Sequence, residues 1–275
     1  MEKPYVISAE LGLYNPRVTP LIREETLEKV RESLDADLRA MGKNTIWMAA
    51  GDIQRGINSL VKQSKLPVLS LDDRYVSKPD GRLGISRGVD ESLNGADYVP
   101  RARYPELEKQ FDLAAELGNE VQLVDDVLFS GDMMLWVTEQ LKRRNIRVGR
   151  VVCGIAIDEG LNKLDEAGMT VDAVSSFSDV EDEICERDFF IVPGSGRRIA
   201  SQNENVLYFD DWYGKPTEWA SIPEEKAQRF FVTSLERSRQ LIRSGTQMLQ
   251  IGKFKGFDSD GDALESIENR ILGEL

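Results

Sequence analysis

Residues 121–131 contain the combination of side chains best suited to chemistry. An apolar run at residues 121–124 ends in two adjacent carboxylates, Asp125 and Asp126, and a turn with Ser130 and Gly131 precedes the next helical pattern. Ionised carboxylates accept hydrogen bonds from a diol, and backbone amides at a helix N-terminus bind an anion. This spacing predicts a site for a sugar phosphate, although an ordinary acidic surface turn would have the same composition.

The elements around this turn must present it at the edge of a sheet. Strands alternating with helices predict a parallel sheet covered on both faces, with ligands at the carboxyl ends of the strands. Strands are expected at residues 45–50, 66–71, 121–124, 148–157, 171–174 and 189–192. Helices are expected at residues 22–41, 57–65, 105–117, 133–142, 161–167 and 221–243, with a polar, glycine-flanked turn at 51–56.

Residues 72–100 differ from the rest of the chain. They hold four glycines, two prolines and several arginines without a steady period. Such a stretch inside a compact domain is typical of a mobile functional loop, and a solvated linker is the alternative. A short hairpin is expected around residues 79–81. The basic candidates in this stretch are Arg74, Lys78, Arg82 and Arg87.

Composition excludes several classes of function. The 275 residues include no histidine, which removes Ser-His-Asp hydrolases, Cys-His proteases and most zinc sites. The net charge of -13 disfavours general binding to nucleic acid or to an anionic membrane. Cys153 and Cys185 predict reduced thiols, and neither a membrane span nor a signal peptide is expected, so a cytoplasmic location is predicted.

The segment from the strand to the glycine resembles the phosphoribosyl-diphosphate motif of the type I phosphoribosyltransferases. That motif is an apolar strand, two acids, an aliphatic residue, two variable residues, Thr or Ser, and Gly, and this chain matches it through Gly131. The resemblance implies an α/β fold with a parallel sheet, a flexible active-site loop, a hood and a helical C-terminal extension. It further implies that Asp125 and Asp126 hold the ribose and Mg²⁺. The substrate-binding residues of the motif would be Val127, Ser130, Gly131, Asp132 and Met133.

The resemblance also assigns roles outside the motif. Residues 1–43 would form an N-terminal helical segment, 44–200 the core with its hood, and 201–275 a mainly helical extension. A pyrophosphate turn would contain Gly51, Asp52, Arg55 and Gly56, and Lys78 and Arg82 of the loop would be catalytic. In the hood, Phe189 and Phe190 would stack on a base, or serve as core residues, and Asp188 would bind the metal. A homodimer is implied as well.

The chain departs from the motif directly after Gly131. Asp132 and Met133 replace a small residue and a threonine, so a phosphate-binding hydroxyl is missing and a carboxylate is added. Repulsion between like charges ~4 Å apart costs about 1 kcal/mol in water and about 4 kcal/mol at intermediate dielectric. Asp132 would be harmless if it pointed to solvent or capped the following helix.

These features lead to one main functional expectation and one alternative. The expectation is Mg²⁺-dependent phosphoribosyl transfer between phosphoribosyl diphosphate and a nitrogen acceptor such as a nucleobase, or the reverse reaction from a nucleoside monophosphate. The alternative is a non-catalytic protein of this fold that senses a nucleotide or binds a partner. A haloacid-dehalogenase-type phosphatase is excluded because Asp72 and Asp73 are adjacent. The acidic tail at 258–262 has the wrong spacing for an EF-hand.

Overall fold

The computed structural model describes residues 2–11, 24–90, 95–101, 104–190, 197–199, 205–206 and 216–244. The chain forms two compact units. Unit 1 comprises residues 1–47, 87–97 and 181–275, and unit 2 comprises residues 48–86 and 98–180. The boundary passes within β2 (Asn44–Ala49), β5 (Ile85–Val89) and β6 (Gly95–Pro100).

Unit 2 is built on a parallel sheet of five strands in the order β4-β3-β7-β8-β9. Residues 151–157 of the central strand β8 are all buried, as expected for a parallel strand covered on both faces. This confirms the predicted α/β class with a parallel sheet. The strands are β3 (Val68–Ser70), β4 (Gly81–Arg82), β7 (Glu120–Leu128), β8 (Arg147–Ile157) and β9 (Val171–Phe177).

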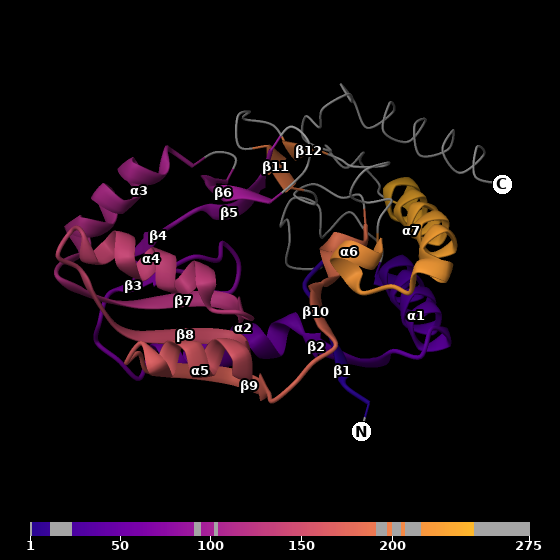
Figure 1. Cartoon of the computed structure of the whole chain (residues 1–275), viewed down its shortest axis with the longest axis horizontal. Helices are drawn as coiled ribbons and strands as arrows, with labels where there is room; N and C mark the ends of the chain where they lie inside the picture. The colour runs from indigo at the N-terminus through magenta and orange to yellow at the C-terminus, as the bar shows by residue number, and fades with distance from the viewer. Residues whose placement is uncertain are drawn as a thin grey trace. The chain divides into compact units, whose positions relative to one another are not determined.

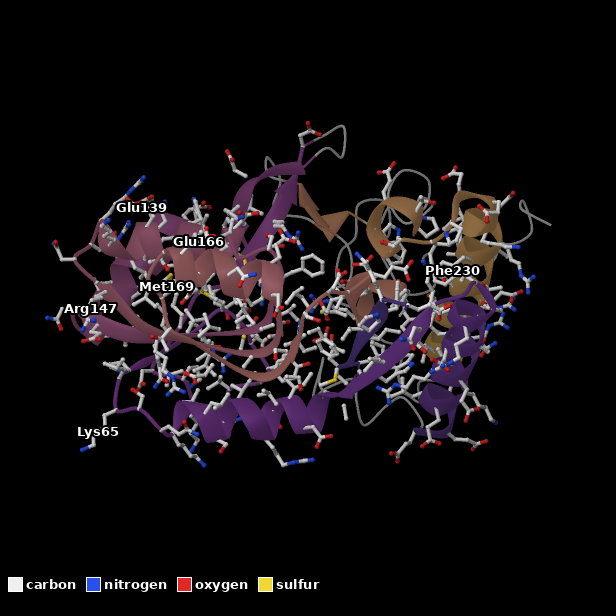
Figure 2. All side chains as sticks on the ribbon, turned by 60° about the horizontal axis from the view of Figure 1, so that its bottom comes forward. Lys65, Glu139, Arg147, Glu166, Met169 and Phe230 are labelled. Atoms are coloured by element: carbon white, nitrogen blue, oxygen red, sulfur yellow. The ribbon has the colours of Figure 1, made fainter. Side chains whose placement is uncertain are left out.

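Helices cover both faces of this sheet (Figure 1). On one face α2 approaches β9 so closely that a β-carbon at Gly56 would lie 2.4 Å from Val174. On the other face Cys153 of β8 shares a core cluster with Val137 of α4 and Leu164 of α5. Charged side chains, among them the labelled Lys65, Glu139 and Arg147, project outward from the unit (Figure 2). The helices are α2 (Ala50–Val61), α3 (Leu107–Ala114) with the 3-10 turn η2 (Ala115–Leu117), α4 (Asp132–Lys142) and α5 (Asp158–Glu166).

The turn predicted at residues 51–56 is wrong. Helix α2 begins at Ala50, directly after β2, and contains the whole segment. Its buried residues Ile53 and Ile57 are four positions apart and therefore lie on one helical face. Burial of that face outweighs the preference of the two glycines for a turn, and Gly56 allows the close approach to β9.

Residues 72–100 are also more regular than expected, because β4, β5 and β6 lie within them. The hairpin expected at 79–81 is wrong: Asp80 accepts a 2.7 Å hydrogen bond from the amide of Val68, and β4 then pairs in parallel with β3. Strands β5 and β6 are neighbours in a four-stranded sheet of order β12-β11-β5-β6. Its other strands are β11 (Arg197–Ile199) and β12 (Asn205–Val206).

Unit 1 contains a strand that was not predicted within the N-terminal segment. The apolar strand β1 (Pro4–Ala9) pairs in parallel with β10 (Asp182–Cys185) and adjoins β2. Helices α1 (Glu24–Ala40) and α7 (Glu224–Ser244) pack together, and Arg237 of α7 donates hydrogen bonds to Asp37 and Ser33 of α1. The short helix α6 (Pro216–Ala220) precedes α7. No helix within the described ranges has both the length and the apolar character needed to cross a membrane.

The strand predicted at residues 189–192 is wrong over its described part. A 3-10 helix, η3 (Glu186–Phe189), occupies its start, and residues 191–192 lie outside the described residues. The Phe189 side chain is fully buried and packs against Trp219 and Phe230, with ring centroids 5.7 and 6.0 Å away. Burial of aromatic area is as favourable in a 3-10 turn as in a strand, so the apolar run alone did not distinguish them.

Candidate active site

The predicted acid pair lies near the carboxyl end of strand β7. Asp125 is 2% exposed and Asp126 is half-buried. Each carboxylate accepts a hydrogen bond from the next backbone amide, at 3.0 Å from Asp126 and 2.9 Å from Val127. Burial, together with the charge of Asp126, raises the pKa of Asp125 well above its usual range, and Arg101 opposes this shift. The pair therefore favours a proton or a cation at this position.

A third carboxylate, Asp72, lies two residues after the end of the neighbouring strand β3. The amide of Leu71 donates to the carbonyl of Val124 at 2.7 Å, so the register of β3 and β7 continues past Ser70 toward the acid pair. Asp72 is 1% exposed, and its Oδ1 accepts hydrogen bonds from two backbone amides, at 2.7 and 2.6 Å. Burial and then the charge of Asp126 raise the pKa of Asp72 to about 6.

Basic side chains surround these acids. Arg82, a predicted loop residue, donates to the carbonyls of Asp72 at 3.0 Å and Val76 at 2.9 Å. Arg101 donates from Nε to the carbonyl of Ile85 at 2.9 Å. Both guanidinium groups lie near Asp73, at 3.7 Å for Arg82 and 3.8 Å for Arg101. The site thus combines buried carboxylates with fixed guanidinium groups, which suits a metal-bound polyphosphate.

Asp73 fixes both ends of the segment that carries these arginines. Besides its two arginine partners it accepts a hydrogen bond from the hydroxyl of Tyr104. Burial and this hydrogen bond raise the pKa of Tyr104 to about 12. Sequence reasoning used Asp72 and Asp73 only to exclude a phosphatase, and it singled out neither Arg101 nor Tyr104. Asp72 and Asp73 could have been predicted as site residues, because they come directly after β3, the strand that neighbours β7.

The turn after β7 leads through a left-handed glycine into α4. Gly131 adopts a φ of +80°, which a side chain would strain, and it is the N-cap of α4. Ser130 donates from Oγ to Oδ2 of Asp132 at 2.9 Å. Met133 packs against the apolar core of unit 2. Compared with the threonine of the motif, Met133 lacks a hydroxyl but adds an apolar contact with this core.

Helix α5 supplies a counter-charge for Asp132. Lys163 of α5 donates to Oδ1 of Asp132, and this pairing lowers the pKa of that carboxylate. The helix can approach because Gly160 lacks a side chain: a β-carbon there would lie 2.5 Å from the carbonyl oxygen of Phe129. The extra negative charge beside the expected phosphate is thus compensated by a residue 31 positions later in the chain.

Other predicted residues lie elsewhere in the structure. Gly51, Asp52, Arg55 and Gly56 belong to α2, where Arg55 pairs with Asp52 and both side chains are well exposed. Lys78 is exposed. Arg87 and the hood residues belong to unit 1.

The hood residues are buried where they were expected to meet a base. Phe189 and Phe190 are both 0% exposed, so their core alternative is the one the structure supports and base stacking on them is wrong. Asp188 is 40% exposed and is hydrogen-bonded to Arg187 at 3.2 Å. Residues 193–196 lie outside the described residues.

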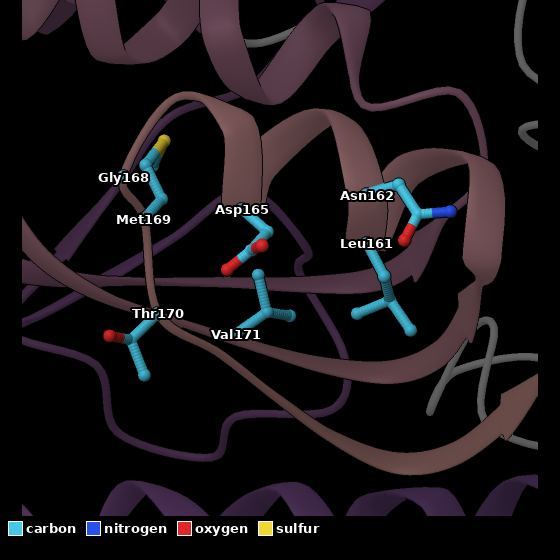
Figure 3. Close-up of a pocket in the computed structure, with 7 residues that line it drawn as sticks. All are labelled: Leu161, Asn162, Asp165, Gly168, Met169, Thr170 and Val171. Carbon is cyan, nitrogen blue, oxygen red and sulfur yellow. The ribbon is translucent and has the colours of Figure 1, made fainter.

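A surface depression of about 520 Å³ lies at the other edge of the sheet (Figure 3). It is lined by seven residues of α5, of the turn after it and of the start of β9, among them Asp165 and Thr170. Parallel strands start at this edge, whereas the acids of β7 lie at the edge where strands end. None of the predicted site residues lines it, so the depression is separate from the candidate site.

Comparisons with known proteins point to one class of enzyme. No family model matches the chain. A uracil phosphoribosyltransferase from Brucella anthropi is 23% identical over 196 residues, which span 64% of this chain and 91% of that protein. A uracil phosphoribosyltransferase from Lachnoclostridium phytofermentans is 39% identical over 77 residues, 28% of this chain and 35% of that protein.

Among solved structures, a purine phosphoribosyltransferase from Pyrococcus horikoshii is 12% identical, with a TM-score of 0.32 over 51% of this chain and 91% of the other. The curated relatives are phosphoribosyltransferases, and they confirm the resemblance to the type I phosphoribosyltransferases that the motif predicted.

Proposed function

We propose that this protein transfers a phosphoribosyl group between phosphoribosyl diphosphate and a nitrogen acceptor, and that the acceptor is a nucleobase. The observation that carries the proposal is the acid pair at the end of β7 followed by the left-handed Gly131 at the start of α4. The similarity to uracil phosphoribosyltransferases over residues that span 91% of one relative supports the same reaction.

The roles follow from the chemistry of each group. Asp125 and Asp126 hold the ribose hydroxyls, since carboxylates accept hydrogen bonds from a diol. Ser130 and the backbone of Gly131 and Asp132 bind the 5-phosphate at the N-terminus of α4. Arg82 and Arg101 stabilise the departing pyrophosphate, since each guanidinium is fixed in place by backbone carbonyls. Exposed Lys78 is proposed as a further cation for the pyrophosphate.

The site residues fit a divalent cation. Carboxylate oxygens are ligands that Mg²⁺ prefers, and Oδ2 of Asp72 is a buried atom that no hydrogen bond satisfies. Asp125 and Asp126 would hold Mg²⁺, with Asp188 as a further proposed ligand. When bound, Mg²⁺ would neutralise the pyrophosphate leaving group.

Unit 2 contains the residues that carry the proposal, within the proposed core of residues 44–200. The remaining parts of the proposal are a homodimeric state and a reducing, cytoplasmic setting. The second of these is consistent with the two cysteines, neither of which forms a disulfide. The charge of Asp132, which would repel a phosphate, is compensated by Lys163.

The test is calorimetric titration of phosphoribosyl diphosphate with Mg²⁺ into the full-length protein, alongside ribose 5-phosphate and nucleoside monophosphates. Binding on the order of micromolar is expected, within the range usual for enzyme substrates. A screen of nucleobases for product formation follows. No binding of any of these ligands would contradict the proposal and favour a non-catalytic role.

Lys163→Gln tests the 5-phosphate end of the site. We expect ribose 5-phosphate to bind roughly 10-fold more weakly, because the variant removes the positive charge that compensates the Asp132 carboxylate beside the phosphate. The affinity for pyrophosphate alone should not change. Both affinities are measured by calorimetry, with Lys142→Gln on the exposed end of α4 as the control. Equal ribose 5-phosphate affinities in the wild type and Lys163→Gln would contradict the proposed role of Lys163 in phosphate binding.

A further inference from the structure

Asp72 lies beside the acid pair, but it is not part of the sequence motif that predicted Asp125 and Asp126. Ser70, the last residue of β3, is paired with Val124 of β7, and the amide of Leu71 still donates to the carbonyl of Val124, so Asp72 and Asp126 each follow this pair by two residues. Residues opposite each other on adjacent strands project from the same face of a sheet. The two carboxylates are therefore neighbours on one face, at the edge where strands of an α/β sheet bind ligands.

One carboxylate oxygen of Asp72 lacks a hydrogen-bond partner. The carboxylate is 1% exposed, and its Oδ1 accepts two backbone hydrogen bonds. Oδ2 is buried and accepts no hydrogen bond, and its ion pair with Nη1 of Arg74 is long, at 3.9 Å. A buried carboxylate oxygen without a close partner is costly, and an unobserved ion is one of the few explanations for such an atom in a native structure.

We propose that Asp72 and Asp126 together bind a divalent cation, with Asp72 as a ligand supplied by the segment directly after the neighbouring strand β3. Because this cation is the one that would accompany phosphoribosyl diphosphate, the inference rests on the proposed function. It adds a ligand from β3 to a site that the sequence motif places on β7 alone. The ligands are hard oxygen atoms, which suit Mg²⁺ or Mn²⁺.

The nearby arginines leave room for this cation. Arg82 and Arg101 are directed to backbone carbonyls and to Asp73. Within unit 2, the described residues of the site hold four carboxylates, on Asp72, Asp73, Asp125 and Asp126, against three guanidinium groups, on Arg74, Arg82 and Arg101. A divalent cation reverses this excess of negative charge and thereby prepares the site for a polyphosphate.

The test uses Mn²⁺ as the probe, with the full-length protein and no other ligand, and follows free Mn²⁺ by electron paramagnetic resonance. The wild type is expected to bind Mn²⁺, and Asp72→Asn and Asp126→Asn are each expected to weaken binding by at least about 10-fold. Asp165→Asn is the matched control: it removes the same charge from an exposed residue of α5 outside the site and should change the affinity less than about 3-fold. Mn²⁺ should also raise the thermal unfolding temperature of the wild type but not of Asp72→Asn.

The outcomes separate this inference from the proposed function. Equal Mn²⁺ affinities in the wild type and Asp72→Asn, or no Mn²⁺ binding by the wild type, would overturn the cation site even if phosphoribosyl diphosphate binds. Binding of Mn²⁺ that depends on Asp72, without binding of phosphoribosyl diphosphate, would support the cation site and contradict the proposed reaction. If Asp72→Asn does not fold, Mn²⁺ binding is measured instead in Asp126→Asn and in Asp72→Glu, which keeps the carboxylate. We expect Mn²⁺ binding to be lost in Asp126→Asn and retained in Asp72→Glu, and the opposite result would overturn the cation site.

Discussion

Replacing both Asp125 and Asp126 with asparagine is expected to lower kcat/KM for phosphoribosyl transfer by at least about 100-fold. Loss of a single well-placed electrostatic group at a reacting centre has effects of about 100- to 1,000-fold. Asparagine keeps the volume and one oxygen of each side chain but removes the charge that would bind ribose hydroxyls and a cation. The buried setting of Asp125 makes this charge more influential than it would be in water.

The measurement for this variant is steady-state turnover together with calorimetric binding of phosphoribosyl diphosphate. The matched control is the substitution Asp165→Asn, which removes the same charge from an exposed residue of α5 that lines the separate depression in Figure 3. We expect its turnover to be within about 2-fold of the wild type, since one exposed charge far from a site has little effect there. Full activity in a folded double variant would contradict the assignment of the acid pair.

Gly160→Ala is expected to destabilise the protein by about 2–3 kcal/mol, within the range for overpacking in a close contact. The new β-carbon would lie 2.5 Å from the carbonyl oxygen of Phe129 and 2.9 Å from Cγ of Leu128. The backbone of Phe129 cannot yield without moving the turn that carries Ser130 and Gly131. The same substitution should therefore also weaken the binding of ribose 5-phosphate.

Chemical denaturation measures the first effect and calorimetry the second. The control is Gly51→Ala in α2, where a β-carbon would meet only Nη1 of Arg55, at 3.3 Å. Because alanine has the higher helix propensity by about 1 kcal/mol, this control should be neutral or stabilising. A Gly160→Ala variant as stable as the control would show that α5 does not contact the turn as closely as the structure indicates.

Local pattern predicted much of the chain correctly. Apolar, β-branched runs located β2, β7, β8 and β9, and helical periodicity located α1, α4 and α7. Pattern failed where burial opposed a local preference. Residues 51–56 contain turn-forming glycines, yet the apolar positions Ile53 and Ile57 bury one face of a helix against the sheet. Phe189 and Phe190 were candidates for stacking because burial and stacking require the same side chain.

The sequence by itself determined the acid pair, Ser130 and Gly131, because these residues are contiguous and their spacing sets their geometry on a strand and the turn after it. Only the tertiary structure decided their environment. Asp72 comes from the segment directly after β3, Arg101 from the residue after β6, and Lys163 from α5. Contacts between residues far apart in the chain depend on how helices and strands pack, and that packing is set by the whole buried core rather than by any local run of residues.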